Sequence, residues 1–88
     1  MPWTLDKSRA RFVSDLNRTE QGLFDRFQNA IANEGLHPKT AADQAGDTDY
    51  KNLQGDQFQI RLSGDKRATF TVDKNAEVCT ILEVGGHT

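Results

Sequence analysis

The feature that most constrains the fold is a regular alternation of apolar and polar residues in the last third of the chain. Phe58, Ile60 and Leu62 alternate with polar residues, and this period of two is typical of a strand with one buried face. A turn-forming segment at 63–66 separates this run from a second alternating run at 67–72. We therefore expect two antiparallel strands joined by a short hairpin.

A third run, at 78–84, follows a second turn-forming segment at 73–76. Apolar residues occur on both sides of its alternation, which indicates a strand that is covered on both faces. We expect this strand to lie centrally and to complete an antiparallel meander.

The N-terminal part of the chain has the period of a helix instead. Phe12, Val13 and Leu16 fall on one stripe, and Asp6 is a suitable N-cap residue. This spacing predicts a first helix that ends near residues 16–17.

A second helix is expected directly after it. Asn17 followed by Glu20 has the spacing of a capping box, in which each side chain binds a free backbone N–H. Apolar residues then recur at helical spacing over 23–31, and Gly35 and Pro38 are typical of the residues after a helix. Two helices joined so closely should run antiparallel.

Residues 36–50 show no clear period and are expected to form a long loop. These elements predict a single α+β domain over residues 1–88. Its N-terminal helical hairpin would pack on one face of a three- to four-stranded antiparallel sheet.

Composition limits the classes of function. The chain has 11 basic and 13 acidic residues and a net charge of −2, whereas a nucleic-acid-binding domain usually has a basic excess. A single cysteine, Cys79, provides neither a disulfide framework nor a multi-cysteine zinc site. The sequence contains no apolar run long enough to span a membrane, and because residues 1–6 lack a secretory apolar core we expect no secretory leader. We expect a cytoplasmic protein without metal or cofactor.

Alternation also predicts which side chains lie on the sheet face away from the helices. If Phe58, Ile60 and Leu62 face the helices, Arg61 and its hairpin neighbour Arg67 share the opposite face. Two guanidinium groups there could bind a phosphate or a carboxylate in bidentate geometry. The alternative is that both arginines only form ion pairs on a solvated sheet, with Asp65, Asp56 or Glu83.

Residues 59–73 resemble the RelE/ParE toxin superfamily of type II toxin–antitoxin systems. In that pattern a strand with an R-x-R-like face leads through a Gly-Asp turn to an arginine and then to an alternating strand, as at Arg61, Gly64, Asp65 and Arg67. The ending Val-Gly-Gly-His at residues 84–87 is similar to the family's Val-Gly-His-Arg-like tail. Residues 50–55, Tyr-Lys-Asn-Leu-Gln-Gly, resemble its K-x-L-x-G approach to the sheet.

The resemblance implies a toxin neutralised by a cognate antitoxin. RelE-like members are ribosome-dependent endoribonucleases (mRNA interferases), whereas ParE-like members poison DNA gyrase. Carried over by position, Arg61, Arg67 and His87 would be the catalytic residues of a RelE-like member. Gln59 and Lys66 would join Arg61 and Arg67 in binding the phosphate.

Two alternatives stay open. The family's terminal Arg and Tyr have no counterpart in the sequence up to Thr88, and among Arg61, Arg67 and His87 only the histidine is of a residue type suited to proton transfer near neutrality. A non-catalytic protein-binding module on the same fold is therefore the second hypothesis, and an unrelated α+β domain is the third. His37 and His87 alone cannot form a metal site, and Cys79 is interpreted as a buried strand residue.

Overall fold

The computed structural model describes residues 2–46 and 48–87, and strand β6 (Val78–His87) lies inside a six-stranded mixed sheet. Two short strands, two helices and three further strands precede it in the chain. They are β1 (Thr4–Asp6), β2 (Arg11–Phe12), α1 (Arg18–Ala32), α2 (Pro38–Ala45), β3 (Lys51–Gln54), β4 (Gln57–Arg61) and β5 (Lys66–Asp73).

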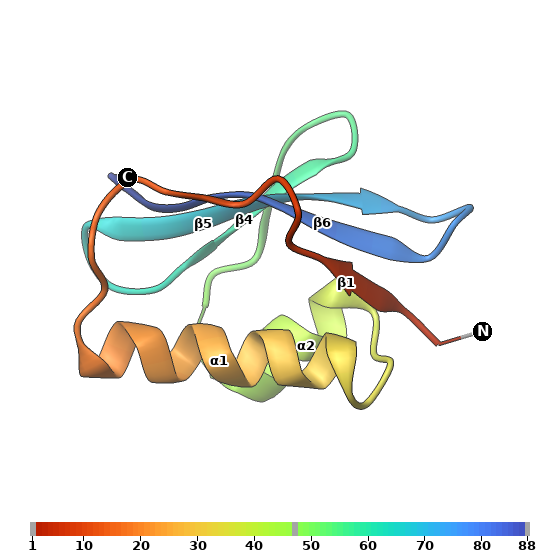
Figure 1. Cartoon of the computed structure of the whole chain (residues 1–88), viewed down its shortest axis with the longest axis horizontal. Coiled ribbons are helices and arrows are strands. Elements are labelled where there is room, and N and C mark those ends of the chain that lie inside the picture. The colour runs from red at the N-terminus through yellow and green to blue at the C-terminus, as the bar shows by residue number, and fades with distance from the viewer. Residues whose placement is uncertain (1, 47, 88) are drawn as a thin grey trace.

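The strand order is β1-β6-β5-β4-β3, and β2 also pairs with β6. Strands β3 to β6 form a consecutive antiparallel meander, whereas β1 and β2 run parallel to β6 along its other edge. Both helices lie on one face of the sheet, and no helix covers the opposite face (Figure 1). We call this uncovered side the outer face. The predicted meander of β4, β5 and β6 is confirmed.

Helix α1 begins as its capping sequence predicts. The Asn17 side chain accepts a hydrogen bond from the Glu20 N–H at 2.8 Å, and the Glu20 carboxylate accepts one from the Asn17 N–H at 2.8 Å. The apolar stripe of the helix then faces the sheet, where Phe27 packs on Phe70 with ring centroids 5.2 Å apart. The core therefore lies between the helices and the inner face, and Ile60 and Ile81 are fully buried there.

The predicted N-terminal helical hairpin is wrong. The segment expected to form the first helix, residues 6–16, is extended and pairs in parallel with β6 through β1 and β2, so both helices follow two strands. A helix here would leave one backbone edge of the buried strand β6 without hydrogen-bond partners. The N-cap residue Asn17 is itself extended, with ψ of 176°, which leads the chain out of a strand into α1.

The predicted loop at 36–50 and the three- to four-stranded sheet are also corrected. The segment contains α2, which begins at Pro38 because proline is well suited to the first turn of a helix. Its buried face consists of Pro38 and small residues, Ala41, Ala42 and Ala45, which give a weak apolar signal. The additional strand β3 is exposed at all four positions and therefore lacks an alternating pattern.

The close approach of the N-terminal segment to β6 can be tested at Gly85. This residue has φ of +91°, and an added Cβ would lie 2.7 Å from the carbonyl oxygen of Ser14. Gly85→Ala should lower the free energy of unfolding by about 1–3 kcal/mol, measured by urea denaturation, because it combines backbone strain with a backbone clash. Gly64→Ala is the control, since nothing lies within 4 Å of its added Cβ. Equal stability of the two variants would contradict the pairing.

The N-cap of α2 predicts a pH dependence. The His37 Nδ1 accepts the Lys39 N–H at 3.0 Å, and burial, with help from Lys74 and Lys39, lowers the pKa of His37. The pKa of His37 is lower in the folded protein than the ordinary histidine value of about 6.5, so the neutral imidazole stabilises the fold at pH values above about 6.5. This contribution is lost as the pH falls through the folded-state pKa. Thermal melts between pH 7.5 and 5 should therefore show a decline that His37→Asn, which keeps a capping group, reduces. Identical pH profiles would rule out this role.

Candidate functional site

The outer face carries a row of polar side chains that crosses the sheet. Residues paired directly across neighbouring strands place their side chains on the same face. The register pairs Arg11 with Glu83, Glu83 with Thr69, Thr69 with Gln59, and Gln59 with Lys51. Five strands thus contribute one residue each, and a carboxylate lies between an arginine and a threonine.

A second row lies beside the first and contains the two arginines that the sequence singled out. Arg67 pairs directly with Arg61 on β4 and with Gly86 on β6, so the predicted common face of Arg61 and Arg67 is confirmed. Their guanidinium groups have different partners, however. Arg61 Nη2 lies 3.9 Å from the Asp49 carboxylate, whereas Arg67 Nη1 donates a hydrogen bond to Gln59 Oε1 at 3.0 Å.

A cavity of about 410 Å³ opens on this face. Its charged lining comes from both ends of the chain, and two leucines and two uncharged polar residues complete it. The charged and apolar residues are Arg9, Arg11, Arg67, Glu83, Leu53 and Leu82. Arg61 and Lys66 do not line the cavity, so the basic group assembled here differs from the predicted one.

Glycine at position 86 brings Arg67 and Glu83 close to one point in space. A Cβ added to Gly86 would lie 2.8 Å from Glu83 Oε1 and 3.8 Å from Arg67 Nε. Arg67 Nε is buried and has no hydrogen-bond partner among the described residues. Arg67 and Glu83 therefore both lie near Gly86, and no ion pair joins them in the described part of the chain.

The other predicted site residues have structural surroundings of their own. Gln59 is only 6% exposed and orients Arg67 through the hydrogen bond between their side chains. Lys66 Nζ donates to the carbonyl oxygen of Asp15, which ties β5 to the N-terminal segment. The backbone of His87 pairs with Lys66 at the end of β6, but the His87 side chain lies outside the described residues.

Sequence reasoning missed Arg9, Arg11 and Glu83. Arg9 and Arg11 fell in the segment predicted to be a helix, whereas the structure places Arg9 in the turn between β1 and β2 and Arg11 on β2. Glu83 was interpreted only as an ion-pair partner for the arginines.

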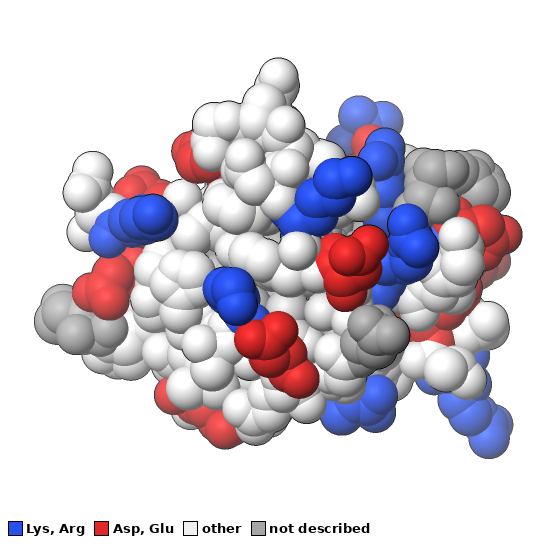
Figure 2. All heavy atoms as spheres, turned by 180° about the vertical axis from the view of Figure 1, so that it is seen from behind, with Lys and Arg blue, Asp and Glu red and all other residues white. Residues whose placement is uncertain are grey.

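Surface charge is mixed rather than uniformly basic. On the face seen in Figure 2, which is the back of the view in Figure 1, lysine and arginine side chains are interspersed with aspartate and glutamate, and no continuous basic surface covers that face. A polyanion would therefore have to bind through a local group of arginines rather than through a general field.

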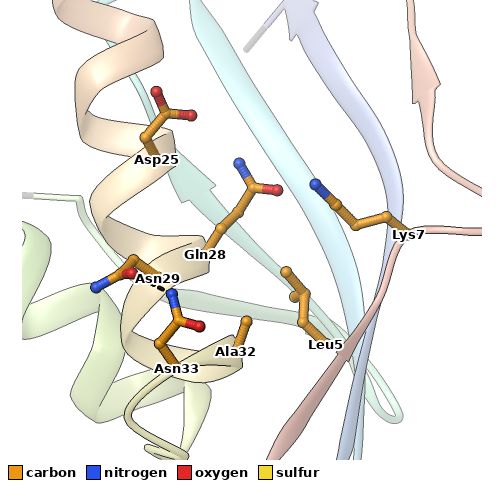
Figure 3. A pocket seen from close by; sticks show the side chains of 7 residues that line it. All are labelled: Leu5, Lys7, Asp25, Gln28, Asn29, Ala32 and Asn33. Carbon is orange, nitrogen blue, oxygen red and sulfur yellow. Dashed lines mark hydrogen bonds between the residues drawn. The ribbon is translucent and has the colours of Figure 1, made fainter.

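A second cavity, of about 330 Å³, lies between the N-terminal strand region and α1. Figure 3 shows the Gln28 side chain extending from α1 between Asp25 and Lys7. Gln28 Oε1 is buried and has no hydrogen-bond partner among the described residues. Amides and one charge of each sign suit polar contacts with a partner better than proton transfer.

The remaining reactive groups lie away from the outer-face cavity. Burial raises the pKa of the Cys79 thiol to about 12, and burial likewise raises the pKa of Tyr50 to about 12. The interpretation of Cys79 as a buried strand residue is confirmed, since it is 0% exposed. Within the described residues, no group of three or more His, Cys, Asp or Glu side chains could hold a metal ion. Neither described helix is long and apolar enough to cross a membrane.

No protein-family model matches the chain, and no curated protein matches it either.

The burial of Cys79 has a measurable consequence. A thiol with a raised pKa and no solvent contact should react with Ellman's reagent at pH 8 only after the chain unfolds. We expect less than about a tenth of the thiol to react in native buffer within minutes and complete reaction in 6 M guanidinium chloride. Rapid native labelling would contradict the position of Cys79 in the core.

Proposed function

We propose that the chain is the toxin-like component of a type II toxin–antitoxin pair, similar to RelE/ParE toxins, and that it acts on mRNA at the ribosome. The observation that carries the proposal is the convergence of Arg9, Arg11 and Arg67 on one cavity of the outer face. Together with the resemblance of residues 59–73, it favours a phosphate-bearing target.

The chemistry of the cavity supports an RNA ligand. Guanidinium groups bind phosphate oxygens in bidentate geometry, and three of them reach one cavity from β5 and from the N-terminal segment. Leu53 and Leu82 supply apolar contact for a base or a ribose, while polar neighbours supply hydrogen bonds. Most of the binding energy would come from phosphate contacts and would fall as salt increases.

The proposal includes a cognate antitoxin as partner and the cytoplasm as the place of action. An overall charge of −2 would weaken nonspecific binding to nucleic acid, so recognition would depend on the local arginines. DNA gyrase is the target in the ParE-like version of the proposal, and that version does not require the arginines to bind RNA.

The second candidate is a non-catalytic protein-binding module. The edge strand β1 and the polar cavity beside α1 favour it, because an exposed edge strand can pair with an extended peptide. Such a module would bind its partner without any need for the outer-face cavity.

Charge removal in the cavity tests the proposed function. Arg11→Gln with Arg67→Gln should abolish growth arrest caused by expression without a partner. In fluorescence anisotropy with single-stranded RNA, the slope of log K against log salt should fall by about 1.4, at about 0.7 per lost phosphate contact. Arg18→Gln with Lys39→Gln is the matched control, because it removes the same charge from exposed positions on the two helices.

The outcomes separate the candidates. Equal weakening by both double variants would mean that RNA binding is nonspecific and would contradict the proposal. Growth arrest without RNA binding would favour gyrase as the target. A protein that is harmless, binds no RNA and is captured through β1 would be the protein-binding module.

A further inference from the structure

We infer that the chain binds an extended segment of a partner protein as an added strand in the groove between β1 and α1. The segment presents uncharged polar side chains to α1 and an apolar side chain to Phe12. The inference rests on the second candidate function and gives that protein-binding module a site and a ligand chemistry. It does not depend on RNA binding at the outer-face cavity.

The outer edge of β1 offers backbone groups to a new strand. The Thr4 N–H donates to the carbonyl oxygen of Glu77 at 3.0 Å, toward β6, so the backbone groups of the next residue, Leu5, point away from β6. On that side neither the N–H nor the C=O of Leu5 has a backbone partner among the described residues. Because β1 is the terminal strand of the sheet order, its free edge can pair with an extended peptide.

Helix α1 makes this edge one wall of a groove. The cavity of about 330 Å³ is lined by Leu5 and Lys7 on the strand side and by five residues from one flank of α1 on the other. These five recur at spacings of three and four, which place them on one side of a helix. They are Asp25, Gln28, Asn29, Ala32 and Asn33. A strand paired with β1 would therefore set alternate side chains against this flank.

The walls of the groove determine the class of ligand. Three amide side chains line it, and its two charged residues, Lys7 and Asp25, have opposite signs. Figure 3 shows these two on either side of Gln28. A polyanion gains little from a wall without net charge, whereas hydroxyl and amide side chains can form hydrogen bonds with the amides. The groove therefore favours a peptide over RNA.

The apolar end of the ligand is determined by Phe12 and Val13. The Phe12 ring packs edge-on against Phe24 of α1, with ring centroids 6.3 Å apart, and Phe24 directly precedes Asp25 of the groove wall. Phe12 is 60% exposed and Val13 is 47% exposed. Both therefore leave apolar surface beyond the polar part of the groove, where an apolar side chain of the ligand can be buried.

The length of the edge sets the length of the segment. Thr4 lies opposite Val78, and Phe12 lies opposite Val84. The stretch of β6 between these two partners spans about 20 Å at about 3.3 Å per residue. An extended segment of about seven residues would reach from β1 to Phe12.

A second copy of this chain fits the edge poorly. Antiparallel pairing of two β1 strands about Leu5 would set Trp3 of one copy opposite Lys7 of the other. The Trp3 N–H already donates to the carbonyl oxygen of Gly35 at 3.0 Å, so the segment that follows α1 occupies that position. The edge is closed at Trp3 and open from Leu5 onward, which suits a separate segment that ends or turns away beside Gly35.

A random heptapeptide phage library selected on the immobilised full chain supplies the probe. The best peptide should carry hydroxyl or amide side chains at alternate positions and an apolar residue at one end. At a concentration about 100 times its Kd, this peptide should slow hydrogen exchange of the Leu5 amide about tenfold or more, measured by NMR. Protection of the other sheet edge, at residues 51–54, would overturn the groove and leave a protein-binding module.

Proline on the edge tests the added strand. Leu5→Pro removes the outward N–H, and proline is tolerated on edge strands, so the peptide Kd in calorimetry should rise about tenfold or more. Leu5→Val is the matched control, because it shortens the same side chain and keeps the N–H, and its Kd should stay within about threefold of the wild type. Equal affinity of the two variants would overturn backbone pairing.

A helix variant keeps the test decisive if proline disturbs β1. Asn29→Ala replaces an exposed groove amide by a better helix former, and the peptide Kd should rise about threefold to tenfold. Gln44→Ala, the loss of an exposed amide from α2, is the control and should bind the peptide like the wild type. Circular dichroism melts confirm that each variant is folded.

The failure of this inference differs from the failure of the proposed functions. A library without any peptide that binds with a Kd below about 1 mM would overturn the protein-binding module together with the groove. Identical peptide affinity of Asn29→Ala and Gln44→Ala would overturn the helix wall alone. Full peptide binding by a wild type that binds no RNA would support the groove and remove the first candidate function.

Discussion

The structure depends on the pairing of β6 along both of its edges. The inner side of this strand is fully buried at Ile81 and Val84, so the backbone groups beside it cannot be left to water. Its outer side is only partly buried, at Thr80, Leu82 and Glu83, so the prediction that the strand is covered on both faces is wrong. Strand β5 pairs with one edge, and the N-terminal segment pairs in parallel with the other through β1 and β2. The extended N-terminus, the placement of both helices on one face and the uncovered outer face follow from this arrangement (Figure 1).

The features that local physics determines could be predicted from the sequence. Alternation identified β4, β5 and β6, and the pair Asn17 and Glu20 identified the start of α1, because both signals involve residues close together in the chain. The N-terminal segment could not be assigned in this way. Its conformation depends on contacts such as the hydrogen bond from Ser14 Oγ to the Gly85 carbonyl oxygen at 2.6 Å, between residues 71 positions apart, and nonlocal pairing overrides a weak helical period.

The same limit applies to the candidate site. Alternation placed Arg61 and Arg67 on one face correctly, but it could not predict which partners their long side chains contact. Asp49, whose carboxylate lies 3.9 Å from Arg61 Nη2, comes from a segment predicted to be a loop, and Arg11 comes from a strand that was predicted to be a helix. Arg9 and Arg11, two of the four charged residues that line the cavity, were therefore missed together with the N-terminal fold. Arg67 was found because its position depends only on a hairpin.

Fold and site are coupled at one pair of residues. The parallel register that satisfies the free edge of β6 also sets Arg11 beside Glu83. Since β2 contains two residues and is exposed at both, this pairing belongs to the weakly protected part of the structure, and local opening would separate it before the core unfolds. Glu83 and Arg67 would remain in place on β6 and β5, whereas Arg9 and Arg11 would move away with the N-terminal segment. Binding of a phosphate-bearing ligand would favour the closed register, because the ligand would contact arginines from both segments, and ligand affinity would thus include the free energy of docking the N-terminal strand.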